Sequence, residues 1–568
     1  MWMDEYEKWV SNPDLPMDLK EDLEGKTLAE LEERFFSPLE FGTGGMRGIL
    51  GAGLNRLNIY TIRKANDGLA RYLVKHYSPA DLNRGVVIAH DNRRYSREFA
   101  LESAKVLGVY GIKSYLFPSL RPTPELSYAT RTLKAISGIV ITASHNPPNY
   151  NGYKIYDEYG CQYTPQYATE IVALVNKTTD VFRIPTKTLE ELRLQGLLEV
   201  LDETIDTDYL AMVKSIQLHP EIQKPLKIVF TPLHGTSAVL GQRLLKETGY
   251  DVTPVESQLV PDPFFSTVTS PNPENPKAFE LARALGDKIG AELLIATDPD
   301  ADRLGIVVKD SGDYHYLSGN QTGAILINYL LSEKKRLGLL PKKGVVFNTI
   351  VTSELGAKIA RSFGFEVVST LTGFKFIGEQ ARLLEGTDKK FLFGYEESFG
   401  YVVNDAVRDK DALQAMLLAS EAANFYHLSE GKTLVQKLMD LYQEFGFHSE
   451  RLESIELVGL DGKKRINRIM AYFHAHTPTV VASIRIKSKA DYLKGVIQTA
   501  SEESPTGYPS SDVVKYTLED DSWFVLRPSG TEPKLKVYVA GSAESLAKAN
   551  QKTQAILLEV KAMIDAID

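Results

Sequence analysis

The chain has 568 residues, of which 43% are hydrophobic and 24% are charged, a composition typical of folded globular proteins and unlike disordered or fibrous ones. Its length predicts roughly three to five domains with separate cores. The formal net charge of −9 is mild and has the wrong sign for a general nucleic-acid binder, so local groups would have to hold any anionic ligand.

The N-terminal segment MWMDEYEKWV predicts a surface helix, because aromatic residues alternate with acids and the basic start and apolar stretch of a signal peptide are missing. The most apolar segments, such as residues 324–331, are far shorter than the roughly 20 residues needed to cross a bilayer. The single cysteine, Cys161, cannot form an internal disulfide or a cysteine-rich metal site. We therefore expect a cytoplasmic protein that binds neither a membrane nor nucleic acid.

Three segments share one pattern, in which an apolar β-branched run is followed by a polar loop and then by a helical pattern. They are residues 85–107, 226–249 and 344–364. The helix N-caps predicted in them are Ser96, Ser237 and Ser353. Continuous apolar runs indicate strands covered on both faces, and their alternation with helices predicts mixed or mostly parallel sheets.

The predicted fold class is α/β, with three related mixed-sheet domains and a C-terminal α+β domain. The last domain differs because residues 523–541 alternate around a turn and are followed by an amphipathic helix. The expected domains are residues 1–205, 206–318, 319–440 and 441–568. Each predicted boundary is defined to within several residues.

The first motif, TASHNPPNYNGYK, presents Ser144 and His145 after an apolar strand that spans 136–142. Two prolines keep the loop out of a helix, and α/β proteins generally bind ligands at the carboxyl ends of strands. The motif by itself leaves two interpretations open, a functional serine or an ordinary turn serine. It does not match the G-x-S-x-G pattern of hydrolases.

The second motif, TDPDADR, alternates Asp298, Asp300 and Asp302 along a loop between two apolar strands. Three converging carboxylates repel one another unless a cation neutralises them, and Mg²⁺ prefers such hard oxygen ligands. The spacing differs from that of an EF-hand loop, since Arg303 follows directly and no glutamate closes the loop. We therefore predict a magnesium site.

Two further motifs carry groups suited to a phosphosugar. In GYEES, Glu396 and Ser398 can bind neighbouring sugar hydroxyls, although the motif by itself also fits an ordinary surface turn. Lys375 lies in a similar loop, TLTGFKF. In RPSGTEPK, the arginine fork, the hydroxyls and the turn N–H groups predict a phosphate cradle. The cradle residues are Arg527, Ser529, Gly530 and Thr531.

Taken together and in this order, these four motifs resemble the active-site signatures of the α-D-phosphohexomutase superfamily, and FGTGGMRG resembles its N-terminal loop. The resemblance extends from about Phe41 to the last domain. It implies four domains around a central active-site cleft. The longer branch that the chain resembles contains phosphoglucomutases and phosphopentomutases.

The resemblance also implies roles. Ser144 would be the phosphorylated nucleophile and would share Mg²⁺ with the three aspartates, while Arg47 and Arg303 would stabilise the transferring group. The acid/base candidates are Lys154, His145 and Lys375. Thr372 and Gly373 would join Glu396 and Ser398 in binding the substrate, and the RPSGTEPK cradle would hold the phosphate that is not reacting.

The implied activity is the interconversion of glucose 1-phosphate and glucose 6-phosphate through a bisphosphate, with glucose 1,6-bisphosphate as activator. A phosphopentomutase or a phosphomannomutase is the alternative, and the sequence leaves hexose and pentose substrates open. A catalytically inactive phosphosugar-binding regulator and a metal-dependent phosphatase are further alternatives. We expect a monomer whose only partner is a small phosphosugar.

Overall fold

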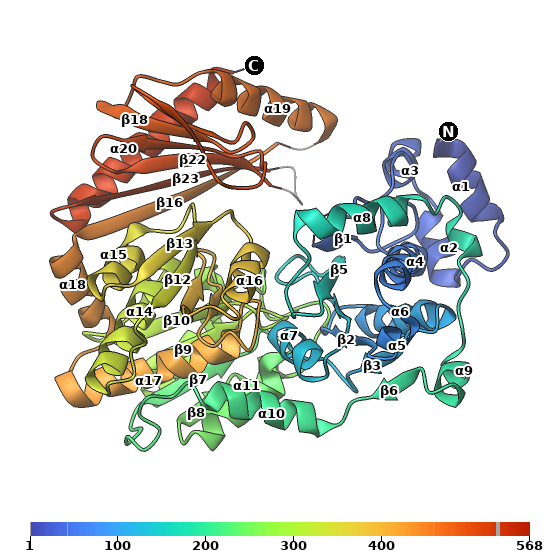
Figure 1. The fold of residues 1–568 in the computed structure, drawn as a ribbon, viewed down its shortest axis with the longest axis horizontal. Helices are drawn as coiled ribbons and strands as arrows, with labels where there is room; N and C mark the ends of the chain where they lie inside the picture. Colours follow the sequence, from blue (N-terminus) through green and yellow to red (C-terminus); the bar gives the residue numbers. More distant parts are fainter. Residues whose placement is uncertain (1, 43, 458, 530–533, 568) are drawn as a thin grey trace. The chain divides into compact units, whose positions relative to one another are not determined.

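The computed structural model describes residues 2–42, 44–457, 459–529 and 534–567 (Figure 1). The chain divides into two compact units. The first contains the residues up to Phe347 together with Gly373–Val435, and the second contains Asn348–Thr372 together with the residues from Gln436 onward. Within the described ranges, none of the helices combines the length and apolar character that a membrane span requires.

The first sheet has the order β1-β5-β4-β2-β3-β6, and its centre, from β4 through β2 and β3 to β6, is parallel. β1 and β5 add antiparallel strands at one edge. The strands are β1 (Gly45–Ile49), β2 (Val86–His90), β3 (Ser114–Leu116), β4 (Ser137–Ile141), β5 (Tyr150–Asp157) and β6 (Leu198–Val200). The helices are α1 (Trp2–Ser11), α2 (Met17–Leu23), α3 (Leu28–Phe35), α4 (Ile59–His76), α5 (Pro79–Leu82), α6 (Ser96–Val109), α7 (Thr123–Thr132), α8 (Pro165–Asn176), the 3₁₀ helix η1 (Val181–Arg183), α9 (Leu189–Leu194) and α10 (Glu203–Lys214).

This sheet is covered on both faces, as its continuous apolar strands predict. Val86 and Ile88 of β2 enter one hydrophobic core, which includes residues of α4, α6 and α8. Val87 and Ala89 enter another core with residues of α7. A strand buried on both sides has no polar face, which explains why β2 lacks hydrophobic alternation.

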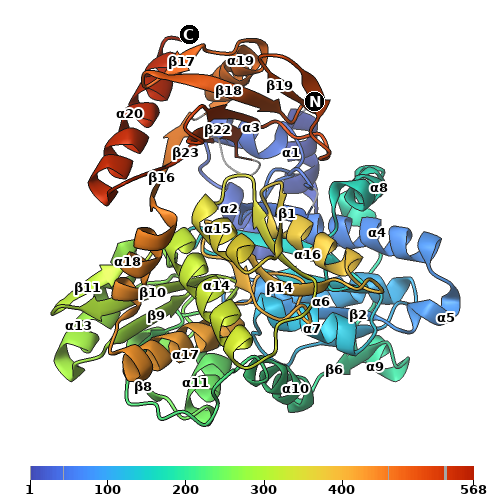
Figure 2. The ribbon, with the colours of Figure 1, turned by 60° about the vertical axis from the view of Figure 1, so that its left-hand side comes forward.

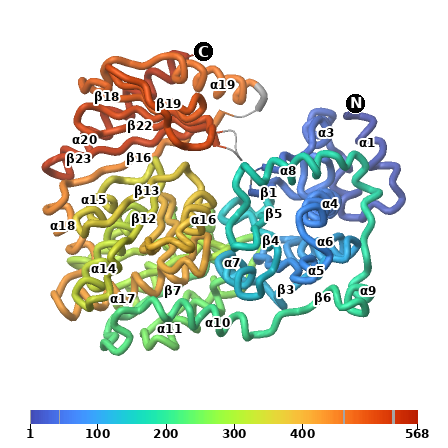
Figure 3. The backbone as a smooth tube through the Cα atoms, in the orientation of Figure 1, coloured from blue at the N-terminus to red at the C-terminus, as the bar shows by residue number. Residues whose placement is uncertain are grey.

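The second sheet has the order β11-β10-β9-β7-β8, with β8, β7 and β9 parallel and with β9, β10 and β11 joined as antiparallel neighbours. Figure 3 follows the backbone from β6 through α10 into this sheet. Its elements are β7 (Lys227–Thr231), α11 (Ser237–Glu247), β8 (Asp251–Pro254), α12 (Glu256–Leu259), the 3₁₀ helix η2 (Pro276–Phe279), α13 (Glu280–Ile289), β9 (Leu293–Thr297), β10 (Leu304–Asp310) and β11 (Asp313–Tyr316).

The third sheet has the order β13-β12-β14-β15, in which β12 and β14 are parallel and β15 is antiparallel to β14. Its elements are α14 (Gly319–Arg336), β12 (Gly344–Thr349), α15 (Glu354–Ser362), β13 (Glu366–Thr370), α16 (Phe374–Leu383), β14 (Lys390–Tyr395), β15 (Tyr401–Val402), α17 (Ala412–Glu430) and α18 (Leu434–Phe445).

The C-terminal sheet is antiparallel, with the order β16-β23-β22-β21-β18-β19-β20 and with β17 paired to β18. Residues of α19 and α20 belong to a hydrophobic core of this sheet. Figure 2 shows both helices beside its strands. The elements are β16 (Phe447–Glu456), α19 (Gly459–Ala475), β17 (Val480–Val481), β18 (Ile484–Asp491), β19 (Val496–Thr499), β20 (Glu503–Pro505), β21 (Val514–Leu518), β22 (Trp523–Pro528), β23 (Lys534–Ala543) and α20 (Leu546–Asp565). The predicted fold class, three mixed-sheet α/β domains and a last domain of different type, is confirmed.

The predicted N-caps are right in one case and wrong in two. Ser353 caps α15 by accepting from the Leu355 N–H. Ser96 and Ser237 are instead the first residues of α6 and α11. Their hydroxyls bind buried side-chain oxygens at 2.6 Å, those of Asp91 and Thr297 respectively, so a buried polar partner replaces the cap.

Candidate active site

Ser144 lies in the loop after β4, at the carboxyl end of a strand inside the first sheet. Its backbone is left-handed, with φ of +50°, a conformation that costs a non-glycine residue about 1–3 kcal/mol. The loop enforces it, because the Ser144 N–H donates to Thr142 Oγ1 at 2.9 Å and the Asn146 N–H donates to the Ala143 carbonyl at 3.1 Å. The turn therefore fixes the direction in which the hydroxyl points.

The loop between β9 and β10 carries Asp298, Asp300 and Asp302, all buried, with one oxygen of each within 4.8 Å of the others. Asp298 Oδ1 accepts from its own loop, from the N–H groups of Asp302 at 3.0 Å and Arg303 at 2.9 Å. Thr123, at the start of α7, donates to Asp300 Oδ2 at 2.9 Å through its hydroxyl. These bonds hold the carboxylates together in spite of their repulsion.

The serine loop and the aspartate loop meet. Ser144 Oγ donates to Asp298 Oδ2 at 2.6 Å and lies 3.1 Å from His145 Nδ1. The two loops come from different sheets, so strand order and packing rather than sequence proximity create this contact. A serine hydroxyl and a cluster of hard oxygen ligands thus share one site.

Two half-buried ammonium groups face the carboxylates. Lys154, on β5, donates to Asp300 Oδ2 at 2.7 Å and to Asp302 Oδ2 at 3.4 Å. Lys410, which the sequence motifs did not indicate, lies with its Nζ 3.0 Å from Asp302 Oδ2. Burial alone would lower the pKa of both lysines, but the carboxylates outweigh it and raise each pKa above its usual value.

The aspartates do not titrate alike. Burial, reinforced by the charges of Asp302 and Asp300, raises the pKa of Asp298 well above its ordinary value. Burial would also raise the pKa of Asp300, but the ammonium groups of Lys154 and Lys410 help to hold that pKa below the usual range. The cluster therefore carries more negative charge than it tolerates without a further cation or proton.

The acidic loop fits a divalent cation. Asp300 Oδ1 and Asp302 Oδ1 are buried and have no hydrogen-bond partner within the described part of the chain. Unpartnered buried carboxylate oxygens are costly, and a hard cation with oxygen ligands satisfies them. The two lysines cannot neutralise all three carboxylates, so charge and ligand chemistry both agree with Mg²⁺.

Arg47 and His145 lie at the serine loop, while Arg303 continues the aspartate loop. Arg47 Nη1 donates to Asn146 Oδ1 at 2.6 Å, and the Arg303 guanidinium pairs with Glu274, a residue that the motifs did not indicate. Burial, followed by the charges of Arg303 and Arg47, lowers the pKa of His145 well below its usual value. The imidazole beside Ser144 is therefore neutral near pH 7.

The predicted sugar-binding residues cluster in part. Glu396 is buried directly after β14, where its Oε1 accepts from the Gly373 N–H at 2.9 Å and burial raises its pKa. Ser398 follows in the same turn. Lys375 is the second residue of α16, with its Nζ 5.2 Å from the ring centroid of the next residue. Thr372 is the last residue of its segment in the second unit.

The predicted phosphate cradle lies in the second unit. Arg527, at the end of β22, donates through Nη1 to the Tyr538 hydroxyl at 3.3 Å. The Ser529 N–H donates to the Lys534 carbonyl at 2.8 Å. Gly530 and Thr531 lie outside the described residues.

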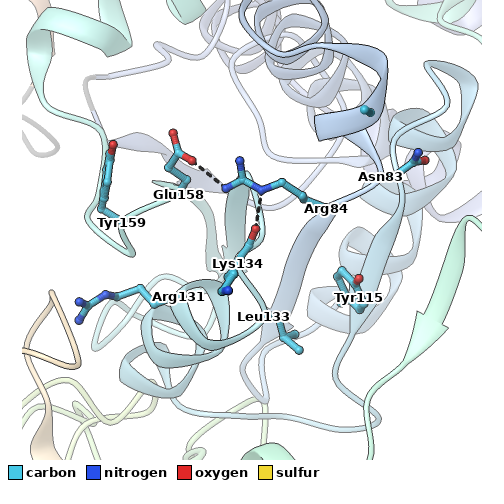
Figure 4. Close-up of a pocket in the computed structure, with 9 residues that line it drawn as sticks. Asn83, Arg84, Tyr115, Arg131, Leu133, Lys134, Glu158 and Tyr159 are labelled. Carbon is cyan, nitrogen blue, oxygen red and sulfur yellow. Dashed lines mark hydrogen bonds and ion pairs between the residues drawn. The ribbon is translucent and has the colours of Figure 1, made fainter.

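A pocket of about 660 Å³ in the first unit contains none of the predicted site residues (Figure 4). Its Arg84 guanidinium is already bound by protein groups, donating to the Lys134 carbonyl and to Glu158 Oε2, both at 2.7 Å. The pocket is lined by Ala80, Asn83, Arg84, Tyr115, Arg131, Leu133, Lys134, Glu158 and Tyr159. The pocket is therefore separate from the candidate site at Ser144 and the aspartates.

Comparisons with known proteins show which family the chain belongs to. The chain matches the phosphoglucomutase/phosphomannomutase alpha/beta/alpha domains I, II and III over residues 38–181, 207–312 and 318–445. It matches the C-terminal domain of the same family over residues 483–556. The helices α1–α3 precede the first matched range.

Among curated proteins, the phosphoglucomutases of Staphylococcus aureus strains MRSA252 and MSSA476 are each 38% identical, covering 93% of this chain and 94% of their own. The solved structure of parafusin, a phosphoglucomutase from Paramecium, has a TM-score of 0.68 at 17% identity and covers 94% of this chain and 96% of its own. A phosphoglucomutase/phosphomannomutase family protein from Burkholderia thailandensis has a TM-score of 0.64 at 19% identity, covering 92% and 97%.

The two solved structures share the fold, whereas the sequence matches extend through all four domains. The chain belongs to the phosphoglucomutase/phosphomannomutase family, within the α-D-phosphohexomutase superfamily that its motifs resemble, and is an isomerase that works by phosphoryl transfer.

Proposed function

We propose that the protein is a phosphoglucomutase that interconverts α-D-glucose 1-phosphate and glucose 6-phosphate through a phosphoserine at Ser144. The observation that supports this best is the 2.6 Å hydrogen bond from Ser144 Oγ to Asp298, in a cluster of three buried carboxylates. The curated relatives that are 38% identical are phosphoglucomutases. One buried cysteine and a phosphosugar substrate both suit the cytoplasm.

In the proposed cycle, the phosphoryl group of phospho-Ser144 moves to the C6 hydroxyl of glucose 1-phosphate. The bond from phosphorus to Ser144 Oγ breaks, a bond from phosphorus to O6 forms, and the hydroxyl proton passes to a group of the enzyme. The resulting glucose 1,6-bisphosphate turns around, and its C1 phosphoryl group returns to Ser144. Glucose 6-phosphate leaves, and no phosphate is released to water.

The residues of the chain mainly position charge around the phosphoryl oxygens, which is what phosphoryl transfer requires of a protein. Asp298, Asp300 and Asp302, with an oxygen of phospho-Ser144, would hold Mg²⁺, which neutralises charge on the transferring group when bound. Arg47 and Arg303 add positive charge from the two loops. The candidates for accepting and returning the proton of the sugar hydroxyl are still His145, Lys154 and Lys375.

Binding of the rest of the substrate is proposed from the motifs. Glu396 and Ser398, with Thr372 and Gly373, would hold the sugar hydroxyls. The phosphate that is not reacting would be held by Arg527, Ser529, Gly530 and Thr531. Such a distal phosphate site lets one centre accept the sugar in both orientations.

The test measures conversion of glucose 1-phosphate to glucose 6-phosphate with Mg²⁺ and catalytic glucose 1,6-bisphosphate. Ser144→Ala should lose turnover, whereas Ser429→Ala, at an exposed serine of α17, should keep it. Mass spectrometry after incubation with the bisphosphate should find phosphate on Ser144. Parallel assays use ribose 1-phosphate and mannose 1-phosphate.

A higher kcat/KM for either alternative sugar would contradict the glucose assignment and leave the phosphoserine mechanism in place. Stoichiometric release of inorganic phosphate would instead indicate a phosphatase. An unphosphorylated Ser144 together with no turnover on any of these sugars would contradict the whole proposal.

A further inference from the structure

Arg93 is not among the residues predicted from the sequence, yet its buried guanidinium binds the loop that carries Ser144. The side chain is 0% exposed. It donates to four backbone carbonyls, through Nη2 to those of Ser144 and Asn146, both at 2.5 Å, and through Nη1 to those of Pro147 at 2.8 Å and Tyr150 at 3.1 Å. Arg93 therefore donates to three carbonyls of the loop and to that of Tyr150, the first residue of β5.

The opposite side of Arg93 is held as well. Its Nε lies 3.3 Å from Asp91 Oδ2, and its guanidinium carbon lies 4.9 Å from the ring centroid of Phe265. The neighbouring Asn92 Nδ2 donates to the Asp262 carbonyl at 2.9 Å. Phe265 and Asp262 belong to the segment between α12 and η2, so this cluster joins the serine loop to the domain that supplies the aspartates.

This arrangement suits arginine and not other residues. The carbonyls of Ser144 and Asn146 accept from Arg93, whereas that of Pro147 also accepts from the Tyr150 N–H at 3.0 Å. Buried carbonyls without donors are costly. Only a planar guanidinium offers several N–H donors in a fixed fork, while lysine offers a compact ammonium group. Replacing Arg93 would remove these hydrogen bonds from the loop that keeps Ser144 in its left-handed conformation.

We propose that Arg93, supported by Phe265, is a positioning residue that fixes Ser144 Oγ relative to Asp298 for phosphoryl transfer. This inference rests on the proposed phosphoserine function. Arg93 acts through backbone carbonyls, so it contributes to the rate of transfer rather than to substrate binding. The residue is distinct from Arg47 and Arg303, which are the candidates for contact with the phosphoryl group.

The test compares Arg93→Met and Arg93→Lys with Arg34→Met. Arg34 is a matched control, because its nearly buried guanidinium also joins a carboxylate, that of Asp22, to a backbone carbonyl, that of Ala52. Since a misplacement of about 1 Å can cost ~10²-fold in rate, we expect kcat to fall by about 10²-fold in Arg93→Met. The lysine variant should recover part of this loss, with KM within about threefold of wild type in both, because binding groups are untouched.

A second measurement separates positioning from general destabilisation. In rapid-quench experiments on labelled phosphoenzyme, Arg93→Met should transfer its phosphoryl group to glucose 1-phosphate about 10²-fold more slowly at saturating substrate. The milder variant Phe265→Leu removes only the ring beneath the guanidinium and should slow transfer by a smaller factor. It provides the same test if Arg93→Met does not fold. Arg34→Met should transfer at the wild-type rate even if its melting temperature falls.

Equal transfer rates in wild type, Arg93→Met and Phe265→Leu would overturn the positioning role, as would a loss confined to KM. Failure of the wild-type enzyme to phosphorylate Ser144 or to turn over glucose 1-phosphate is a separate outcome. It would refute the proposed function before any variant is compared.

Discussion

Three carboxylates within 4.8 Å of one another are an unusual feature for a buried loop, because each aspartate adds charge that its neighbours repel. Lys154 and Lys410 reduce this repulsion without removing it. Functional sites commonly retain such local destabilisation because a ligand relieves it. At the residue scale, the aspartates should therefore cost stability in the absence of metal.

Asp298→Asn tests this cost. The amide keeps the shape and the acceptor for the two loop N–H groups, while one buried charge disappears. In EDTA the variant should melt at or above the wild-type temperature. With Mg²⁺ at about 100 Kd, wild type should gain about 2.7 kcal/mol of stability and the variant much less, with turnover lost.

Thermal melts with and without Mg²⁺ measure this difference. Asp310→Asn, at the far end of β10, is the control and should behave as wild type. If Asp298→Asn melted well below wild type in EDTA, the carboxylate would be stabilising by itself and the argument from repulsion would be wrong.

At the scale of single elements, the C-terminal end of α19 is held by a histidine between two carboxylates. His474 Nδ1 lies 2.9 Å from Asp491 Oδ1, and its Nε2 lies 2.8 Å from Asp512 Oδ1. The His474 carbonyl accepts from Lys489 Nζ at 2.8 Å and from Lys494 Nζ at 2.9 Å. Burial would lower the pKa of His474, but the two carboxylates outweigh it and raise that pKa.

This shift makes the anchoring of α19 depend on pH. A histidine that is more basic in the folded state contributes its full stabilisation below about pH 6.5, its unfolded pKa, and loses it as pH rises through the raised folded pKa. His474→Gln should therefore weaken the protection of α19 amides by about 1–3 kcal/mol at pH 5.5 and by less at pH 9.

Hydrogen exchange, corrected for the intrinsic rate at each pH, measures this protection. His476→Gln changes an exposed histidine next to the end of the same helix and is the control. A deficit in His474→Gln that stays constant across the pH range would contradict the ion-pair explanation.

At the scale of the whole molecule, the two compact units contain different parts of the chemistry. Ser144 and the aspartates belong to the first unit, whereas Arg527 and Ser529 belong to the second. A ligand stabilises only the folded state that binds it. Mg²⁺ alone should therefore stabilise the first unit and leave the second unchanged.

Differential scanning calorimetry should show separate transitions, with Mg²⁺ raising only one of them by ~2–4 °C. Tryptophan fluorescence assigns the shifted transition to one of the units, because Trp2 and Trp9 lie in the first unit and Trp523 lies in the second. In Trp523→Phe the remaining signal reports the first unit and should shift with the metal. A single transition that shifts as a whole would contradict independent units.

The sequence by itself determined the fold class and the separate chemical motifs. Continuous apolar strands such as β2 predict sheets covered on both faces, and a serine or an acidic alternation at the end of a strand predicts a site, because these signals are local. The aspartate cluster that the sequence predicts does form. The roles of its residues, like the domain boundaries, stay predictions.

Only the tertiary structure decided which side chains complete the site. Arg93, Glu274 and Lys410 lie outside the four chemical motifs, and they reach the centre because loops from three separate sheets converge. The hydroxyl of Ser237 likewise bonds Thr297 Oγ1 instead of capping α11. Contacts between residues far apart in sequence depend on packing and strand order, which periodicity along one segment does not encode.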